Sequence, residues 1–405
     1  MNEYRFSLHK SLSNLETFFL FRALLTPNFH STGRQRVHPL TVRLALKLKG
    51  RNMNVLTRKG LVALTAGALA LTTIGAATAS HAATAAKGSC AVSGAAFSTD
   101  DAVGGVQFAD LTKTLGAQPK PKKGTKLGSL MKFLGNQYWI DLAAGQKTRA
   151  AKYGITVDVQ AAASESDQIG QLNSMQTMLL KGYTGFLVSP QTNTNLCPAV
   201  EKAESRGKLV LNVNDGVLPG AKNWVGPNQI SNGVLAAEYF IKNLPAGSEV
   251  ANIQGQVGAY AAIQRTKGFV DTAKKGGLNV VAVQPGNWDV TTAQNAATDI
   301  LKAHPNLKAF YADNDGMALG VVTAVGNAGL KGKVMIIGTD GIGDAYKAIK
   351  AGDLTGTVDS YPNLTGQVAV DVALRLLAGQ KVPRAVYTPV ALITAANVNA
   401  PAPKL

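Results

Sequence analysis

Groups of polar residues follow one apolar run after another in this sequence. In Tyr311–Gly320 (YADNDGMALG), two acids flank an amide at the point where an apolar run ends. Carboxylates accept hydrogen bonds, amides accept and donate them, arginine donates them in a fixed fork, and aromatic rings cover C–H surfaces. Such residues recur at the ends of several runs, and the candidate site consists of Lys132, Asn136, Tyr138, Trp139, Asn214, Asp215, Arg265, Trp288, Asp289, Asn314, Asp340 and Ser360. This mixture suits a ligand with many hydroxyl groups, and we predict a sugar.

Other kinds of site need patterns that this sequence lacks. A metal site needs a compact cage of oxygen ligands or a His/Cys cluster, yet His304 is the only histidine after residue 82. A phosphate site needs a glycine-rich loop before a helix, and neither GxxxxGK[ST] nor GxGxxG follows a predicted strand. Asp313 and Asp315 have the composition of a glycosidase pair, but they lie two residues apart at a strand-to-helix junction, where we expect their side chains to point in opposite directions. We therefore predict a binding protein with no cofactor and no metal, and not an enzyme.

Single residues at these strand ends have a structural explanation as well. Trp139 alone fits a hydrophobic core, and Asp315 fits a helix N-cap. Asp340, which precedes a glycine, fits a turn. The argument for a site rests on the whole set, because parallel strands bring their carboxyl ends to one edge of a sheet.

Short predicted strands and helices alternate from residue 126 onward. KLGSLMKFL at 126–134 predicts a strand, and YWIDLAAGQKTRAAKYG at 138–154 predicts a helix. The alternation pauses at WVGPNQ (224–229) and continues through about ten units in all. About ten strand–helix units are too many for one compact sheet. The predicted fold is therefore α/β, with two similar Rossmann-like lobes built on parallel sheets.

The N-terminal region has the layout of a secretory signal peptide. From Met53, a basic segment precedes an apolar run over 61–79, and small residues end in SHA at Ala82. We predict a signal peptide at 53–82 with cleavage near Ala82, and export to the periplasm or the cell surface. A transmembrane anchor is the alternative, because the run is near the shortest length that spans a bilayer.

The flanking segments have no clear domain pattern. Residues 1–52 precede the signal peptide, so we interpret them as a disordered gene-start artefact. Residues 83–125 are rich in small residues, proline and lysine, and we expect a partly disordered leader.

The net charge of +17 does not indicate a nucleic-acid partner. Residues 1–86 carry +9, and the remaining residues carry +8. A surplus spread over so long a chain is weak evidence for a polyanion. The two cysteines, Cys90 and Cys197, could pair after export, but the sequence leaves their pairing open. Lipid attachment at Cys90 is not expected, since Lys87 stands where an apolar residue is needed.

From Lys126 to about Val398, the chain resembles the ribose-type periplasmic sugar-binding proteins of ABC importers. The resemblance rests on LGNQYWIDLAAG, FLVSPQT, IQGQVGAYAAIQRTKGF, QPGNWD, YADNDGMALG, IIGTDG and GTVDSYPNLTGQVAV, which occur in the family's order. It implies a type I periplasmic binding protein fold, in which a three-crossing hinge joins two lobes around the ligand. The implied lobes are 126–227 plus 362–388 and 228–361 plus 389–400. A transcription regulator of the same fold would need a helix-turn-helix before residue 126, where the signal peptide lies.

The resemblance also implies a function. A monomer would capture a monosaccharide or polyol and deliver it to the membrane subunits of an ABC importer. Hydrogen-bonding positions of the family match Asn136, Asn214, Asp215, Arg265, Asn314 and Asp340, and stacking positions match Tyr138, Trp139 and Trp288. Lys132, Thr339 and Ser360 depart from the ribose-binding pattern, which argues against ribose. A lysine at position 132 also resembles the autoinducer-2-binding branch, so a furanosyl signal molecule is the alternative ligand.

Overall fold

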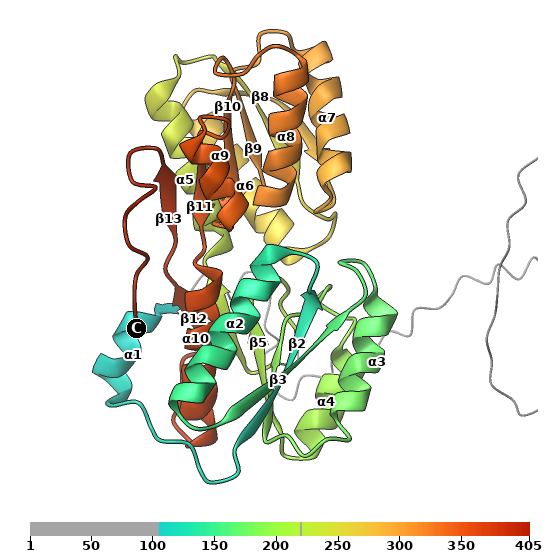
Figure 1. Ribbon diagram of the computed structural model, residues 1–405, viewed down its shortest axis with the longest axis vertical. Coiled ribbons are helices and arrows are strands. Elements are labelled where there is room, and N and C mark those ends of the chain that lie inside the picture. The colour runs from blue at the N-terminus through green and yellow to red at the C-terminus, as the bar shows by residue number, and fades with distance from the viewer. Residues whose placement is uncertain (1–104, 219–220) are drawn as a thin grey trace, which may run out of the picture. The chain divides into compact units, whose positions relative to one another are not determined.

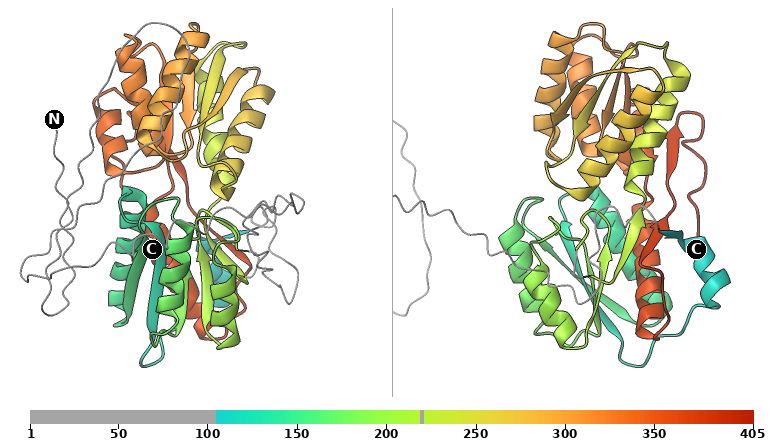
Figure 2. Two further views of the ribbon diagram at one scale, coloured as in Figure 1. Left: turned by 90° about the vertical axis from the view of Figure 1, so that its right-hand side faces the viewer. Right: turned by 180° about the vertical axis from the view of Figure 1, so that it is seen from behind.

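The computed structural model describes residues 105–218 and 221–405, and it consists of two α/β lobes (Figure 1). Each lobe is a sheet with helices on both faces (Figure 2). The prediction of two lobes with parallel sheets is confirmed. The predicted gene-start segment, the signal peptide, most of the leader and Cys90 lie outside the described residues. Cys197 is buried at the start of a helix.

Within the described residues, the sheet of the N-terminal lobe has the strand order β1-β12-β6-β5-β4-β2-β3 and is parallel throughout. Its strands are β1 (Val106–Gln107), β2 (Lys126–Phe133), β3 (Thr156–Ala162), β4 (Gly185–Val188), β5 (Leu209–Val213), β6 (Asn223–Pro227) and β12 (Ala385–Thr388). The helices of this lobe are α1 (Phe108–Leu115), α2 (Gln137–Lys152), α3 (Gln168–Met178), α4 (Cys197–Ser205) and α10 (Pro362–Leu377).

The sheet of the C-terminal lobe has the order β13-β11-β10-β9-β7-β8, and all its neighbours are parallel except β13, which runs antiparallel to β11. Its strands are β7 (Glu249–Gln254), β8 (Asn279–Pro285), β9 (Ala309–Ala312), β10 (Met335–Asp340), β11 (Gly356–Asp359) and β13 (Ala391–Thr394). The helices are α5 (Gln229–Asn243), α6 (Tyr260–Lys275), α7 (Val290–Ala303), α8 (Asp315–Asn327) and α9 (Gly343–Lys350). Among the described residues, no helix combines the length and apolar character needed to cross a membrane.

Three elements differ from the sequence prediction. Strand β1 and helix α1 lie inside the segment read as a leader, where β1 pairs with β12. The α1 helix is short, so packing must hold it; Leu111 is fully buried, and the guanidinium of Arg375 donates to the carbonyl of Gly116 at 3.0 Å. Strand β6 follows β5 without an intervening helix, and it contains most of the WVGPNQ stretch, for which no strand was predicted.

The chain passes between the lobes three times, from β6 to α5, from β11 to α10 and from β12 to β13. The second crossing turns at Tyr361, whose φ of 45° lies in the left-handed region. The carboxylate of Asp359 holds this turn. It accepts hydrogen bonds from the backbone N–H of Tyr361 at 2.6 Å and from the hydroxyl of Tyr346 at 2.8 Å. Burial raises the pKa of Asp359 to about 7.

Helices α5 and α6 of the C-terminal lobe approach each other at two glycines. A β-carbon on Gly233 would lie 2.0 Å from the carbonyl oxygen of Arg265, and one on Gly268 would lie 2.2 Å from that of Ile230. Because α6 carries Arg265 toward the other lobe, this close approach fixes where its side chain begins.

We expect Gly233→Ala to destabilise the protein by about 1–3 kcal/mol, because the added methyl group forces α5 and α6 apart. Gly326→Ala is the matched control in helix α8, since a β-carbon there meets no atom within 4 Å. The control should leave stability unchanged or raise it by up to about 1 kcal/mol, through helix propensity. Urea unfolding of both variants measures the difference. Equal stability of the two variants would contradict the packing described for α5 and α6.

The free energy of unfolding should fall as the pH rises from about 4 to about 7, because the folded state holds a proton on Asp359 that the unfolded state releases. Asp359→Asn removes this titration and should flatten the fall by on the order of 2–4 kcal/mol. Urea unfolding at about pH 5 and about pH 8 compares the two proteins. An equally steep fall in the variant would show that Asp359 titrates normally.

Candidate ligand-binding site

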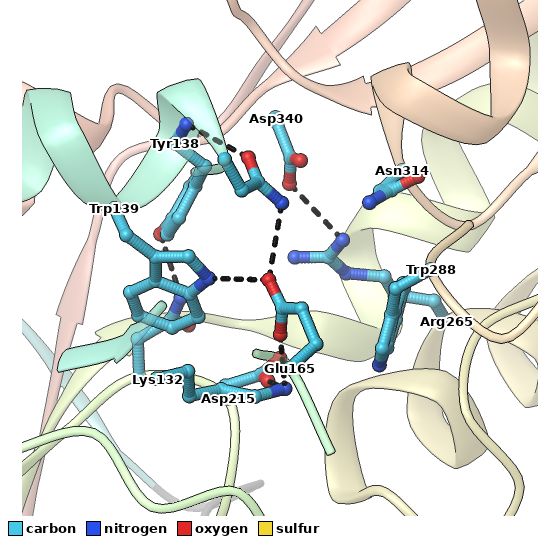
Figure 3. A pocket seen from close by; sticks show the side chains of 11 residues that line it. Lys132, Tyr138, Trp139, Glu165, Asp215, Arg265, Trp288, Asn314 and Asp340 are labelled. Carbon is cyan, nitrogen blue, oxygen red and sulfur yellow. Dashed lines mark hydrogen bonds and ion pairs between the residues drawn. The ribbon is translucent and has the colours of Figure 1, made fainter. Parts of the chain in front are cut away.

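A small cavity lies where the carboxyl ends of the two sheets face each other (Figure 3). The N-terminal lobe lines it with Lys132, Asn136, Tyr138, Trp139, Glu165, Asn214 and Asp215, and the C-terminal lobe lines it with Arg265, Trp288, Asn314 and Asp340. Each of these residues lies at or just beyond the end of a parallel strand, or in the first turns of the helix that follows. The cavity is therefore the ligand position that the strand-end rule predicts.

The structure brings ten of the twelve predicted site residues together around this cavity. Asp289 does not reach it: the residue is exposed, and its carboxylate caps helix α7 by accepting from the backbone N–H and the hydroxyl of Thr292 at 2.7 and 2.8 Å. Ser360 lies outside it, fully buried behind the cavity, where its hydroxyl accepts a hydrogen bond from Asn232 at 3.4 Å.

Glu165 lines the cavity although the sequence analysis did not single it out. It lies in the loop that follows β3, so the strand-end rule would have included it. The surrounding stretch AAASESDQ contains small and polar residues but none of the aromatic or glycine residues that mark the other loops. That plain composition explains why it was missed.

Lys132 is the buried cation of the N-terminal lobe, with a side chain that is only 1% exposed. Its ammonium forms ion pairs with Asp215 and, at 3.1 Å, with Glu165. Burial alone would lower the pKa of Lys132, but the two carboxylates outweigh it and raise that pKa above its ordinary value. The ammonium also lies 5.8 Å from the ring centre of Trp139 and 5.6 Å from that of Trp288, on the opposite lobe.

Arg265 is the buried cation of the C-terminal lobe. Its guanidinium donates to Asp340 at 3.2 Å and to the backbone carbonyl of Asp313. Burial raises the pKa of Asp340 well above its usual range; Arg265 opposes this shift, whereas Asp315 and Asp215 add to it. Among the described residues, the second terminal nitrogen of Arg265 and one carboxylate oxygen of Asp340 have no partner, so both can serve a ligand.

A chain of hydrogen bonds joins the two lobes behind the cavity. The amide of Asn214 donates to the hydroxyl of Tyr138 at 2.6 Å and accepts from Gln229 at 2.7 Å. Gln229, at the start of α5, in turn accepts from Nε of Arg265 at 2.7 Å. Side chains of one lobe therefore orient the arginine of the other.

Asp313 and Asp315 support the site without facing it. Asp313 accepts from Asn252 and from the backbone N–H of Gly255, both at 2.9 Å. Asp315 accepts from the N–H groups of Gly341 and Ile342 at 2.8 and 3.0 Å. The two carboxylates point to different loops, as expected, so they do not form a catalytic pair. Burial raises the pKa of each to about 6.

Asn314 lies between these acids and caps helix α8, because its side-chain oxygen accepts from the backbone N–H of Met317 at 2.8 Å. The helix cap therefore belongs to Asn314 and not to Asp315. The amide nitrogen of Asn314 has no partner among the described residues and is available to a ligand in the cavity.

Several lining residues adopt backbone conformations that side chains disfavour. Asn214 and Asp215 have φ values of 51°, Trp288 has 64° and Asp340 has 134°. Such conformations cost about 1–3 kcal/mol each and persist where the surrounding structure imposes them. Their concentration around one cavity is typical of a functional site.

The model of the periplasmic binding protein domain family matches residues 127–381. The chain is 36% identical to the D-allose-binding periplasmic protein of Escherichia coli over 243 residues, which cover 58% of this chain and 78% of that protein. It is 32% identical to the D-ribose/D-allose-binding protein of Pseudomonas aeruginosa over 283 residues, which cover 67% and 89% of the two chains.

A solved structure of a solute-binding protein is also similar to this chain. The ABC transporter periplasmic solute-binding protein of Actinobacillus succinogenes, with bound D-allose, has a TM-score of 0.65 and 30% identity, over 68% of this chain and 99% of that one. The residues that the family model matches contain most strands of both sheets and every residue that lines the cavity. The chain therefore belongs to the periplasmic binding protein family, with the two-lobed type I fold.

Proposed function

We propose that this protein captures a monosaccharide or polyol between its two lobes and delivers it to an ABC importer. One observation carries the proposal: each lobe presents a buried cation beside a carboxylate to the same cavity. A sugar hydroxyl donates one hydrogen bond and accepts others, so such a donor–acceptor pair suits it. Lys132 with Asp215 forms the pair on one lobe, and Arg265 with Asp340 forms the pair on the other.

The remaining walls fit the other surfaces of a sugar ring. Trp139 and Trp288 provide aromatic faces for C–H groups.

D-allose is the first ligand to test. The relatives described above are named for D-allose and D-ribose/D-allose, and D-allose is bound in the Actinobacillus protein. Lys132 departs from the pattern of the ribose-binding proteins, which argues against ribose. These names also support a monosaccharide over the furanosyl signal molecule considered as an alternative.

Ligand capture would close the lobes because a sugar contacts both at once. The closed state gains the contacts that the open state lacks, and the three crossings are short enough to act as a hinge. We propose that the protein acts as an exported monomer in the periplasm or at the cell surface, with the membrane subunits of an importer as partners and without turning over its ligand.

A thermal-shift screen against pentoses, hexoses, deoxy-sugars, polyols and autoinducer-2 tests this function. A ligand at about a hundred times its dissociation constant adds about 2.7 kcal/mol of stability, so we expect a clear shift with at least one monosaccharide or polyol. A shift with autoinducer-2 alone would reject the sugar assignment in favour of the furanosyl ligand.

Asn314→Ala and Asp340→Ala should each weaken binding of that sugar by about ten- to a hundredfold, because each variant removes a group that can bind a hydroxyl. Asp289→Ala is the matched control at the same end of the C-terminal lobe, outside the cavity. Calorimetric titration measures all three. Wild-type affinity in both cavity variants would place the ligand elsewhere.

Export predicts a mature protein that begins near Ala83. N-terminal sequencing and mass spectrometry of the protein from its native cells should find this end and no peptide from residues 1–52. Peptides from that segment would refute the proposed start at Met53.

A further inference from the structure

Glu165 enters the cavity from a loop that its neighbours hold in place. Asp167, two residues later, caps α3 by accepting from the backbone N–H of Gly170 at 2.8 Å. The amide of Gln191 donates to the carbonyl of Ser164 at 2.8 Å. The backbone of Glu165 is thus anchored on both sides, so its side chain is directed before any ligand arrives.

Three donors of the N-terminal lobe converge on the carboxylate of Glu165 (Figure 3). The indole N–H of Trp139 donates at 2.9 Å and the amide of Asn136 at 3.2 Å to one oxygen, and the ammonium of Lys132 lies 3.1 Å from the other. Glu165 therefore orients an aromatic face and a cation of the cavity wall. Its own side chain is 19% exposed, so it also lies between the cavity and solvent.

The cavity wall carries three carboxylates and two cations. Both cations are already paired: Lys132 with Asp215 and Glu165, and Arg265 with Asp340. A ligand carboxylate or phosphate would find each cation already beside a carboxyl group, and it would lie near the carboxylates of Glu165 and Asp215. Like charges brought together in a buried site disfavour binding strongly.

We infer that Glu165 is the residue that determines ligand charge at this site: it neutralises the Lys132 ammonium, so that the cavity takes neutral sugars and rejects sugar acids and sugar phosphates. The inference rests on the proposed sugar-binding function. Without Glu165, Lys132 keeps one carboxylate partner, Asp215, and part of its charge becomes available to an anionic group of the ligand. Glu165 is in addition a positioning residue for Trp139.

Two probes that share a sugar ring and differ in charge at one exocyclic carbon test the inference. One is a monosaccharide that the wild-type protein binds, with D-allose tried first; the other is the same sugar oxidised to the carboxylate at C6. We expect wild type to prefer the neutral sugar by at least about a hundredfold. Glu165→Gln keeps the shape of the side chain and removes its charge. It should weaken neutral binding by about tenfold or more and reduce the preference by at least about tenfold.

Two further variants separate charge from position. Glu165→Asp keeps the negative charge but is too short to retain all three contacts, so neutral binding should weaken while the preference for the neutral sugar persists. Asp289→Asn removes one negative charge outside the cavity and should change neither quantity. Melting of the unliganded variants identifies any loss of folding, and the ratio of the two affinities is a readout that general destabilisation does not change.

The outcomes are distinct. A reduced preference in Glu165→Gln, with the preference retained in Glu165→Asp, supports the inference. An unchanged preference in Glu165→Gln, in a protein whose wild type binds the neutral sugar, overturns the role of Glu165 and leaves the proposed function standing. Failure of the wild-type protein to bind any neutral monosaccharide or polyol overturns the proposed function and the inference together.

Discussion

The ammonium of Lys132 is buried, and a buried charge is tolerated only when it is paired. This constraint determines much of the cavity. Asp215, after β5, and Glu165, after β3, both turn their carboxylates toward Lys132 on β2. The same carboxylate of Glu165 then orders Trp139, whose ring forms part of the wall. One cation thus brings together the ends of three strands before any ligand is present.

The C-terminal lobe repeats this arrangement with different residues. Arg265 takes the place of the lysine, and Asp340 accepts from it. The arginine is itself oriented by Gln229, which reaches back through Asn214 to the other lobe. The two halves of the site are therefore not independent, because the hydrogen-bond chain behind the cavity spans the region that must bend. Lobe movement would have to stretch or break that chain, and a bridging ligand offers replacement contacts.

The sequence predicted the lobes and most of the cavity for a physical reason. Parallel strands buried on both faces read as short apolar runs, and their carboxyl ends must meet at one edge, so residues such as Asn314 and Asp340 could be assigned together. The sequence pattern is ambiguous where an aspartate follows a strand, because such a residue can contact a ligand or cap the next helix. Asp289 lies just beyond a strand end, as the predicted ligand contacts do. Its carboxylate, however, binds an N–H group at the start of α7 that would otherwise be unpaired.

Glu165 was missed because its stretch has a plain composition, and the first helix was missed because distant parts of the chain support it. Both depend on contacts with residues far away in the sequence: Glu165 becomes part of the site through Lys132, and α1 is held by α10 and β12. Local composition carries no record of such contacts. Helix propensity and strand periodicity therefore located the elements of each lobe, whereas the pairing of buried charges required the structure.

The central claim is that one ligand contacts both lobes at once. Small-angle X-ray scattering of the mature protein, before and after saturation with a bound sugar, tests it most directly. The account predicts a smaller radius of gyration with ligand, because the sugar draws the lobes together. An unchanged radius, in a protein that calorimetry shows to be saturated, would contradict ligand-driven closure and confine binding to a single lobe or to a cavity that is already closed.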